Sequence, residues 1–365
     1  MSLTALNLLI SLSCFTGWLS LLLAVAPSTR APRATVEART ALASAGLEEI
    51  SGLAASHQSP GIFWAHNDSG NRAEVIAIDT HGERVMALEL PIPFVDPEDL
   101  SIASCPPGLE AVSGESCIWL ADVGDNQHQR THRSIWVMRE PILARTQRKL
   151  NARPVEKLTR SELLELPISF PKKIDRLPNI EAISVSAAGD RFWLFEKGDR
   201  AEARVWQGGV EAATQEIKLR ALPSLQSALL GWRAPQPRPA RITSATLNAE
   251  GTRLFLRTYG AVFLFQLPHP YALDMLSLLQ PKRLARVSAD EPQGEALTLS
   301  ADERTLWSAS ELRNGQQPPL RQWSLEEALQ PAPFFISRGG DLERGWARLK
   351  GDREPEAAAR SEFTL

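Results

Sequence analysis

The chain has 365 residues, of which 43% are hydrophobic, so it can bury a large core as one large domain or two ordinary ones. Its net charge of −3 gives no basic field, which argues against nucleic-acid binding. The sequence has no P-loop, no dinucleotide fingerprint and no G-x-S-x-G turn, so these enzyme classes are not indicated.

The N-terminal segment is not expected to belong to the fold. Residues 3–26 form one uncharged apolar stretch that ends in the small-residue pattern Ala24-Val25-Ala26. We interpret residues 1–28 as a signal peptide. An uncleaved membrane anchor is the alternative, because no Lys or Arg precedes the run and it is long enough to span a bilayer. The signal-peptide interpretation predicts a periplasmic or secreted protein. The alternative predicts a membrane-anchored protein whose propeller lies outside the cytoplasm and which meets the membrane only through this uncleaved segment.

Residues 48–330 repeat one structural unit. Each unit starts with a small or acidic residue that leads a short strand, and a turn rich in Gly, Asp, Asn or Ser follows. The leading residues are Ser51, Glu98, Glu181, Ser244 and Glu295. A second strand then carries a large aromatic, which is Trp64, Trp119, Trp193, Phe255 or Trp307. Third strands are expected at 74–79, 134–140, 203–207, 261–268 and 320–325.

Repeated antiparallel meanders of three or four strands predict an all-β fold, a single β-propeller of five or six four-stranded blades at residues 34–337. A sandwich is the alternative packing, but it needs no such repeat. Five units are visible. A sixth blade could be assembled from strands near 34–48 and 332–337, which would also close the ring. Residues 338–365 are highly charged and are predicted to be a disordered tail.

Two cysteines flank a loop rich in Pro and Gly within the second unit. A hairpin there would bring Cys105 and Cys117 together, so we predict a disulfide. Two separate buried thiols are the alternative. The disulfide would fit an oxidising compartment and thus agrees with export.

Charged residues recur at two positions of the repeat. The first strand of each propeller blade lines the central channel, so Glu98, Glu181 and Glu295 are predicted to point into it from three blades. The second strands lead to loops on one face. These loops carry Asn67, Asp68, Asp122, Asp125, Glu196, Lys197, Arg257, Thr258, Ser310 and Glu311. Charges do not fit inside a buried strand unless they are paired.

Such clustered carboxylates suit a hard cation, because Ca²⁺ takes six to eight oxygen ligands. The predicted ligands are Glu98, Asp122, Asp125, Glu181, Glu295 and Glu311. The predicted catalytic residues are Glu181, Glu196, Lys197 and Arg257. One glutamate would activate water, and the two cationic side chains would orient a small or anionic substrate. The alternative is that the same charges pair with each other and with backbone N–H groups to lock the blades together.

Four segments carry a resemblance to a known family. They are LADVGDNQHQRTHRSIWVMREP, NIEAISV with WLFEK, ITSATLNAEGTRLFLRTY and QGEALTLSADERTLWSASE. Over residues 45–330 they resemble bacterial exported phytase-like β-propeller proteins. The resemblance implies a propeller in the cell envelope or outside the cell, but no settled activity, since the group is largely uncharacterised. Propeller phytases bind calcium and cleave inositol phosphates, yet their phosphate-binding Lys and Arg residues have no residue-by-residue match here.

Two hypotheses follow. The first is an exported, monomeric, cation-dependent hydrolase that acts on a phosphoester, ester or lactone at a carboxylate-lined propeller face. The second is a non-catalytic envelope propeller that binds a ligand or a protein.

Overall fold

The structure is a computed structural model, and it describes residues 37–109, 114–143, 154–198, 202–211, 216–226, 240–286, 291, 293–313, 315 and 319–325. The predicted signal or anchor segment and the predicted tail lie outside these residues. Among the described residues, no helix is both long enough and apolar enough to cross a membrane.

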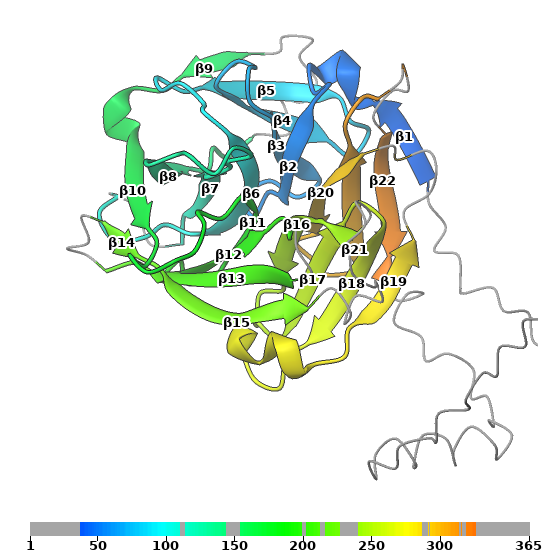
Figure 1. The fold of residues 1–365 in the computed structure, drawn as a ribbon. Helices are drawn as coiled ribbons and strands as arrows, with labels where there is room; N and C mark the ends of the chain where they lie inside the picture. The colour runs from blue at the N-terminus through cyan, green and yellow to red at the C-terminus, as the bar shows by residue number, and fades with distance from the viewer. Residues whose placement is uncertain are drawn as a thin grey trace, which may run out of the picture. The chain divides into compact units, whose positions relative to one another are not determined.

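Five sheets built from antiparallel meanders surround a central channel and form a five-bladed β-propeller (Figure 1). The innermost strands are β2 (Ile50–Ala55), β6 (Pro97–Ser104), β11 (Ile180–Val185), β16 (Ile242–Leu247) and β20 (Gly294–Leu299). Each inner strand contacts the inner strand of the next blade, and β20 contacts β2. The ring is therefore closed, and the predicted all-β propeller is confirmed with five blades.

The outer strands follow each inner strand as a meander. Blade 1 contains β3 (Ile62–Asn67), β4 (Glu74–Asp79) and β5 (Arg84–Glu89), and blade 2 contains β7 (Ser116–Asp122), β8 (Arg133–Arg139) and β10 (Leu163–Ser169). Blade 3 contains β12 (Arg191–Glu196), β13 (Glu202–Gly209) and β15 (Arg220–Gln226), and blade 4 contains β17 (Arg253–Thr258), β18 (Ala261–Gln266) and β19 (Lys282–Arg286). The described residues also contain the short 3₁₀ helices η1 (Leu42–Ala45), η3 (Arg160–Glu162) and η6 (Leu273–Leu278).

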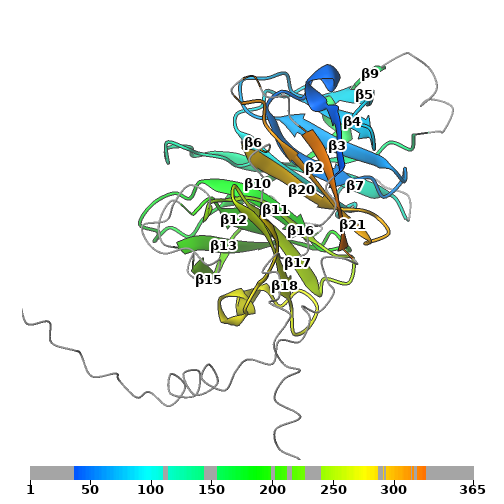
Figure 2. The ribbon, with the colours of Figure 1, turned by 90° about the vertical axis from the view of Figure 1, so that its right-hand side faces the viewer.

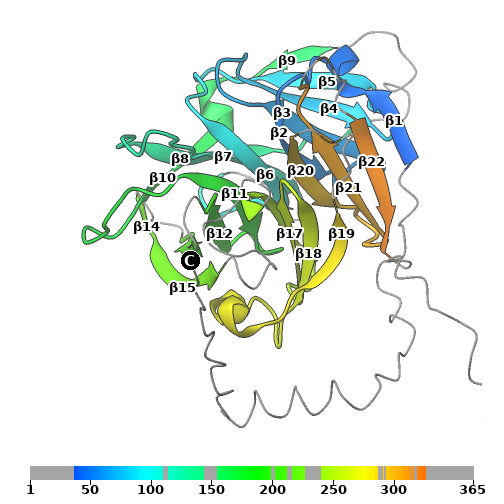
Figure 3. The same cartoon turned by 45° about the vertical axis from the view of Figure 1, so that its right-hand side comes forward.

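The fifth blade is completed by the N-terminal strand. Its sheet runs β20, β21 (Thr305–Ser310), β22 (Pro319–Ser324) and then β1 (Glu37–Ala41), as Figure 3 shows. A sixth blade built from residues 34–48 was therefore a wrong prediction. The strand found there pairs with β22, which joins distant parts of the chain in one sheet and closes the ring. Residues 332–337 lie outside the described residues.

Two short strands extend blades 1 and 2 at their outer edges. β9 (Val155–Lys157) pairs in parallel with β5, as Figure 2 shows, and β14 (Ile217–Lys218) pairs in parallel with β10. The described part of the long interval between the second and third inner strands thus contains an excursion back to blade 1 and no additional blade. Pairing along these edges covers backbone groups that would otherwise template aggregation.

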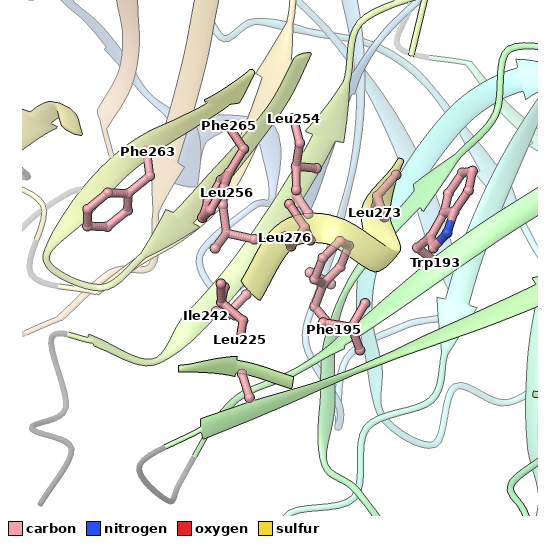
Figure 4. Close-up of a cluster of buried hydrophobic side chains, with 14 of the residues drawn as sticks. Trp193, Phe195, Leu225, Ile242, Leu254, Leu256, Phe263, Phe265, Leu273 and Leu276 are labelled. Atoms are coloured by element: carbon pink, nitrogen blue, oxygen red, sulfur yellow. The ribbon is translucent and has the colours of Figure 1, made fainter. Parts of the chain in front are cut away.

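Large side chains fill the space between blades. Trp64, Trp119, Trp193, Phe255 and Trp307, the aromatics of the second strands, are all buried. Figure 4 shows the cluster between blades 3 and 4, where η6 lays Leu273 and Leu276 against both sheets. Each such side chain contributes about 1.5–3 kcal/mol on burial. This packing gives the channel a rigid wall.

The predicted disulfide is confirmed. Cys105 and Cys117 are bonded across the β6–β7 hairpin, with Cα atoms 4.9 Å apart. Disulfides persist in oxidising compartments, so this bond agrees with a non-cytoplasmic location.

Candidate functional site

A cavity of about 370 Å³ lies at the mouth of the channel where the inner strands begin. We call it the channel-mouth cavity. It is lined by Ser51, Asp68, Glu98, Asn126, Glu181, Lys197, Arg241, Tyr259, Gln293, Glu295, Glu311 and Arg313. Five of these residues are carboxylic acids and three are cationic, so the cavity carries an excess of acidic groups.

A repeated β-bulge places the first set of lining residues. In all five blades the pairing between the first two strands shifts by one residue, which leaves one unpaired residue near the start of the inner strand. The unpaired residues are Ser51, Glu98, Glu181, Thr243 and Glu295. Bulges re-aim side chains out of the ladder, and all but Thr243 line the cavity. The fourth equivalent is thus Thr243 rather than the predicted Ser244.

The second set of lining residues lies one position beyond the second strands. Asp68, Lys197, Tyr259 and Glu311 directly follow β3, β12, β17 and β21. Neighbouring side chains of an extended chain point in opposite directions. Lys197 therefore lines the cavity, whereas Glu196 does not.

Two of the predicted catalytic residues lie outside the cavity in buried ion pairs. The Glu196 carboxylate accepts hydrogen bonds from Nε and Nη2 of Arg204, both at 2.8 Å, and from Arg176 at 3.2 Å. Arg257 is fully buried, with Nη2 3.3 Å from an oxygen of Glu291. Both residues match the alternative interpretation, in which charges hold blades and loops together.

Two of the predicted metal ligands anchor the loop that follows β7. Asp122 accepts the N–H of Asp96 at 2.9 Å and pairs with Arg130 at 2.7 Å. Asp125 accepts the N–H groups of Gln129 and Arg130, both at 2.9 Å. The DVGDN segment is therefore fastened by its own aspartates, which leaves Gly124 and Asn126 to face the site.

Lys197 contacts two other residues that line the cavity. Its Nζ donates to Oε1 of Glu181 at 2.8 Å and lies 5.9 Å from the centre of the Tyr259 ring. The same glutamate oxygen accepts a hydrogen bond from Asn179 at 2.7 Å, and Asn179 also accepts the N–H of Asp125 at 2.7 Å. Asn179 thereby ties the DVGDN loop to the glutamate that binds the lysine.

Glu98 differs from Glu181 because it has no such partner. Only 6% of Glu98 is exposed, and no hydrogen-bond donor of the described residues contacts its carboxylate. The backbone of Gly124 lies directly against it, and a Cβ at that position would overlap one oxygen of Glu98 and one of Asp96. Glycine thus allows two carboxylates to converge on one point.

Burial and mutual repulsion raise the pKa values of the cavity acids. The pKa of Glu181 is raised to about 7, chiefly by burial. Burial, followed by the charges of Glu181 and Glu311, raises the pKa of Glu295 to about 8. Burial and Glu181 raise the pKa of Glu98 well above its usual value. The carboxylates are therefore short of positive charge, even though Lys197 stands among them.

The six predicted calcium ligands are not brought together. Glu98, Glu181, Glu295 and Glu311 line the cavity, whereas the two aspartates hold a loop. Among the described residues, no three Asp, Glu, His or Cys side chains lie close enough to hold one metal ion. The arrangement thus does not offer a preformed calcium cage within that part of the chain, and calcium stays a prediction.

A buried aspartate that the sequence analysis missed lies next to Glu98. Asp99 is 1% exposed and accepts the N–H groups of Ile183 at 3.2 Å and Ala245 at 3.4 Å. The Ser244 hydroxyl donates to the same oxygen at 3.2 Å. Asp99 therefore joins blades 2, 3 and 4 through its side chain. Its adjacency to Glu98 in the PED segment was the only signal in the sequence.

One cluster on blade 2 contains the residue types of a serine hydrolase. Ser134 lies 3.2 Å from Nε2 of His132 and donates to Glu165 at 2.8 Å. The same His132 nitrogen lies 3.0 Å from Glu165. A Ser-His-acid relay uses both ring nitrogens, one for the serine and one for the acid, so this cluster does not match it.

Comparison with known proteins adds little beyond the fold. No family model and no curated protein matches the chain. Solved structures similar to it include U3-55K and the WD40 repeats of RRP9, each with a TM-score of 0.33 and 14% identity. A putative 6-phosphogluconolactonase from Bacteroides uniformis has a TM-score of 0.35 and 12% identity. Each alignment covers 75% of this chain and 67% of the other, and at these scores none bears on what this chain binds.

Proposed function

We propose that this protein is an exported β-propeller that binds a small, positively charged ligand in the channel-mouth cavity. One observation carries the proposal: five carboxylic acids share one cavity with three cationic side chains, and one of the acids is buried without a hydrogen-bond partner among the described residues. A buried carboxylate is costly unless a cation or several donors compensate it. A cationic ligand would supply that compensation.

Export is supported by the disulfide and by the apolar N-terminal segment. It also agrees with the resemblance to exported phytase-like propellers. We therefore propose that the propeller lies in the periplasm or outside the cell. The charge of the proposed ligand departs from the anionic substrate that the sequence favoured, because Arg257 is buried in an ion pair and Lys197 is bound to Glu181.

Thermal unfolding of the full chain tests the proposal. Calcium chloride or propylammonium chloride should raise the melting temperature. A ligand at 100 times its Kd should add about 2.7 kcal/mol to the free energy of unfolding. For a propeller of about 290 residues, this gain in unfolding free energy corresponds to a rise in melting temperature of about 4 °C. Glu295→Gln should reduce the shift, whereas Asp274→Asn, an exposed residue on η6, should not. A stabilising effect of citrate, with none from either cation, would overturn the proposal.

Hydrolysis is the second candidate, and one observation favours it. Glu181, with a pKa near 7, can exchange a proton at neutral pH and so has the property of a general base. Lys197, 2.8 Å away, would orient a polar group of the substrate. Turnover of a phosphoester, ester or lactone panel, with and without calcium, tests this role. Activity that survives Glu181→Gln would exclude Glu181 as the base.

A further inference from the structure

We propose that Asp96 and Glu98, above Gly124, form a subsite for the primary ammonium group of an organic ligand. This inference rests on the proposed function, because it names the chemical class of the cation and the point where it binds. It depends on three features of the described residues: the unpartnered glutamate, the ammonium already present in the cavity, and the glycine beneath the pair.

Several acids act on the charge of this glutamate. The charges of Glu181, Asp96 and Asp68 disfavour its carboxylate form, and the Lys197 ammonium favours it. Asp96 in turn faces Asp68, Asp122, the Arg130 guanidinium and the Ser69 hydroxyl. Arg130 is already held by Asp122 at 2.7 Å. The two carboxylates therefore converge at a point where, among the described residues, no cationic side chain donates a hydrogen bond to Glu98.

The cavity itself shows how an ammonium group is held. The Lys197 ammonium lies 2.8 Å from Glu181 and within reach of the Tyr259 ring. Both contacts are favourable for a cation, and N⁺–H···O⁻ hydrogen bonds are among the strongest in proteins. Glu98 is the equivalent of Glu181 in the neighbouring blade, since both are bulge residues. A ligand ammonium at Glu98 would repeat the interaction that Lys197 makes at Glu181.

The shape of the subsite favours an N–H donor over a metal ion. Two carboxylates supply acceptors for the three N–H groups of an ammonium, but fewer oxygens than the six to eight that calcium takes. The cavity of about 370 Å³ also has room for an organic molecule, within the usual range of ligand sites. Gly124 keeps the two carboxylates together, because any side chain there would displace both.

Titration calorimetry of the full chain at low ionic strength distinguishes the contribution of ligand charge to affinity from that of N–H donation. The probes are propylammonium, its neutral isostere 1-propanol, tetramethylammonium, which has charge but no N–H, and calcium. Propylammonium should bind at least tenfold more tightly than 1-propanol and tetramethylammonium. Glu98→Gln and Gly124→Ala should each weaken it at least tenfold. Gly209→Ala is the matched control, because a Cβ there meets no close atom.

Each contrary result has a distinct meaning. Equal binding of propylammonium and tetramethylammonium, or binding of calcium alone, would overturn the ammonium class while leaving the proposed cation site intact. Wild-type affinity in Glu98→Gln, with a folded protein by circular dichroism, would overturn the assignment of the subsite, and Asp96→Asn would check it independently. Absence of binding by every cation would overturn both this inference and the proposed function.

Discussion

Glu196→Gln tests whether a buried glutamate of β12 fastens the fold or belongs to the site. Its carboxylate binds Arg204 through two hydrogen bonds of 2.8 Å and Arg176 through one of 3.2 Å. Glutamine has the same shape but loses the charge and turns one acceptor into a donor. Arg176 would then lose its ion pair with Glu196, whereas Arg204 would keep a second carboxylate, Asp175, at 3.1 Å.

The expected loss of stability is moderate. Removing one partner of a buried ion pair costs about 3–5 kcal/mol. The side chains of Arg204 and Arg176 remain 18% and 22% exposed, so water can hydrate them after the change. We therefore expect a loss of about 2–3 kcal/mol. With an unfolding entropy of about 2.1 cal/mol/K per residue over about 290 residues, the melting temperature should fall by about 3–5 °C.

Thermal unfolding by circular dichroism measures this change. The matched control is Glu202→Gln, which alters an exposed residue of β13 that hydrogen bonds with Gln226. Cation binding in the channel-mouth cavity should stay within twofold of the wild type in both variants. A melting temperature unchanged within 1 °C, together with loss of cation binding, would refute this reasoning and return Glu196 to the site.

Three further predictions concern stability. Glu181 and Glu295 have pKa values raised to about 7 and 8, so their stabilising contribution is complete below about pH 4.5 and lost as the pH rises through those values. The melting temperature should therefore fall between pH 5 and pH 9, and Glu295→Gln should flatten this dependence in a pH series. Changing Cys105 and Cys117 together to serine should cost about 3 kcal/mol in denaturant unfolding, because the bond closes a loop with a sequence separation of 12, and dithiothreitol should not affect that variant. Deleting residues 1–41 removes β1 from β22, so limited proteolysis should cut first within the fifth blade.

Much of the fold could be predicted from the sequence. The alternation of strands and turns and the five buried aromatics identified the propeller, because each blade must bury the same wedge against its neighbour. The leading glutamates Glu98, Glu181 and Glu295 were found for a similar reason. A bulge recurs at the same point of each blade, so the residue that it leaves unpaired recurs at the same position of the sequence repeat.

The rest of the candidate site depends on single-residue register, which the sequence does not show. Glu196 and Lys197 are neighbours, yet one lies in a buried ion pair and the other lines the cavity. Periodicity assigns the end of a strand only to within a few residues, while the direction of a side chain reverses at each step. Asp96 and Gly124 were missed for a different reason, since they lie in loops whose meeting depends on the tertiary fold.

Ion pairs outside the cavity stabilise the fold and position the loop that lies against the cavity acids. Asp122 and Asp125 hold the DVGDN loop, and this loop presents Gly124 to Glu98. An unpartnered buried carboxylate destabilises the fold, and ion pairs such as that of Glu196 and the packed aromatics offset the cost elsewhere. Different residues should therefore determine the stability of the fold and the affinity for the ligand. Changes to the outer ion pairs should lower the melting temperature with little effect on ligand binding, whereas neutralising Glu98 should weaken ammonium binding at least tenfold in a fold that becomes more stable.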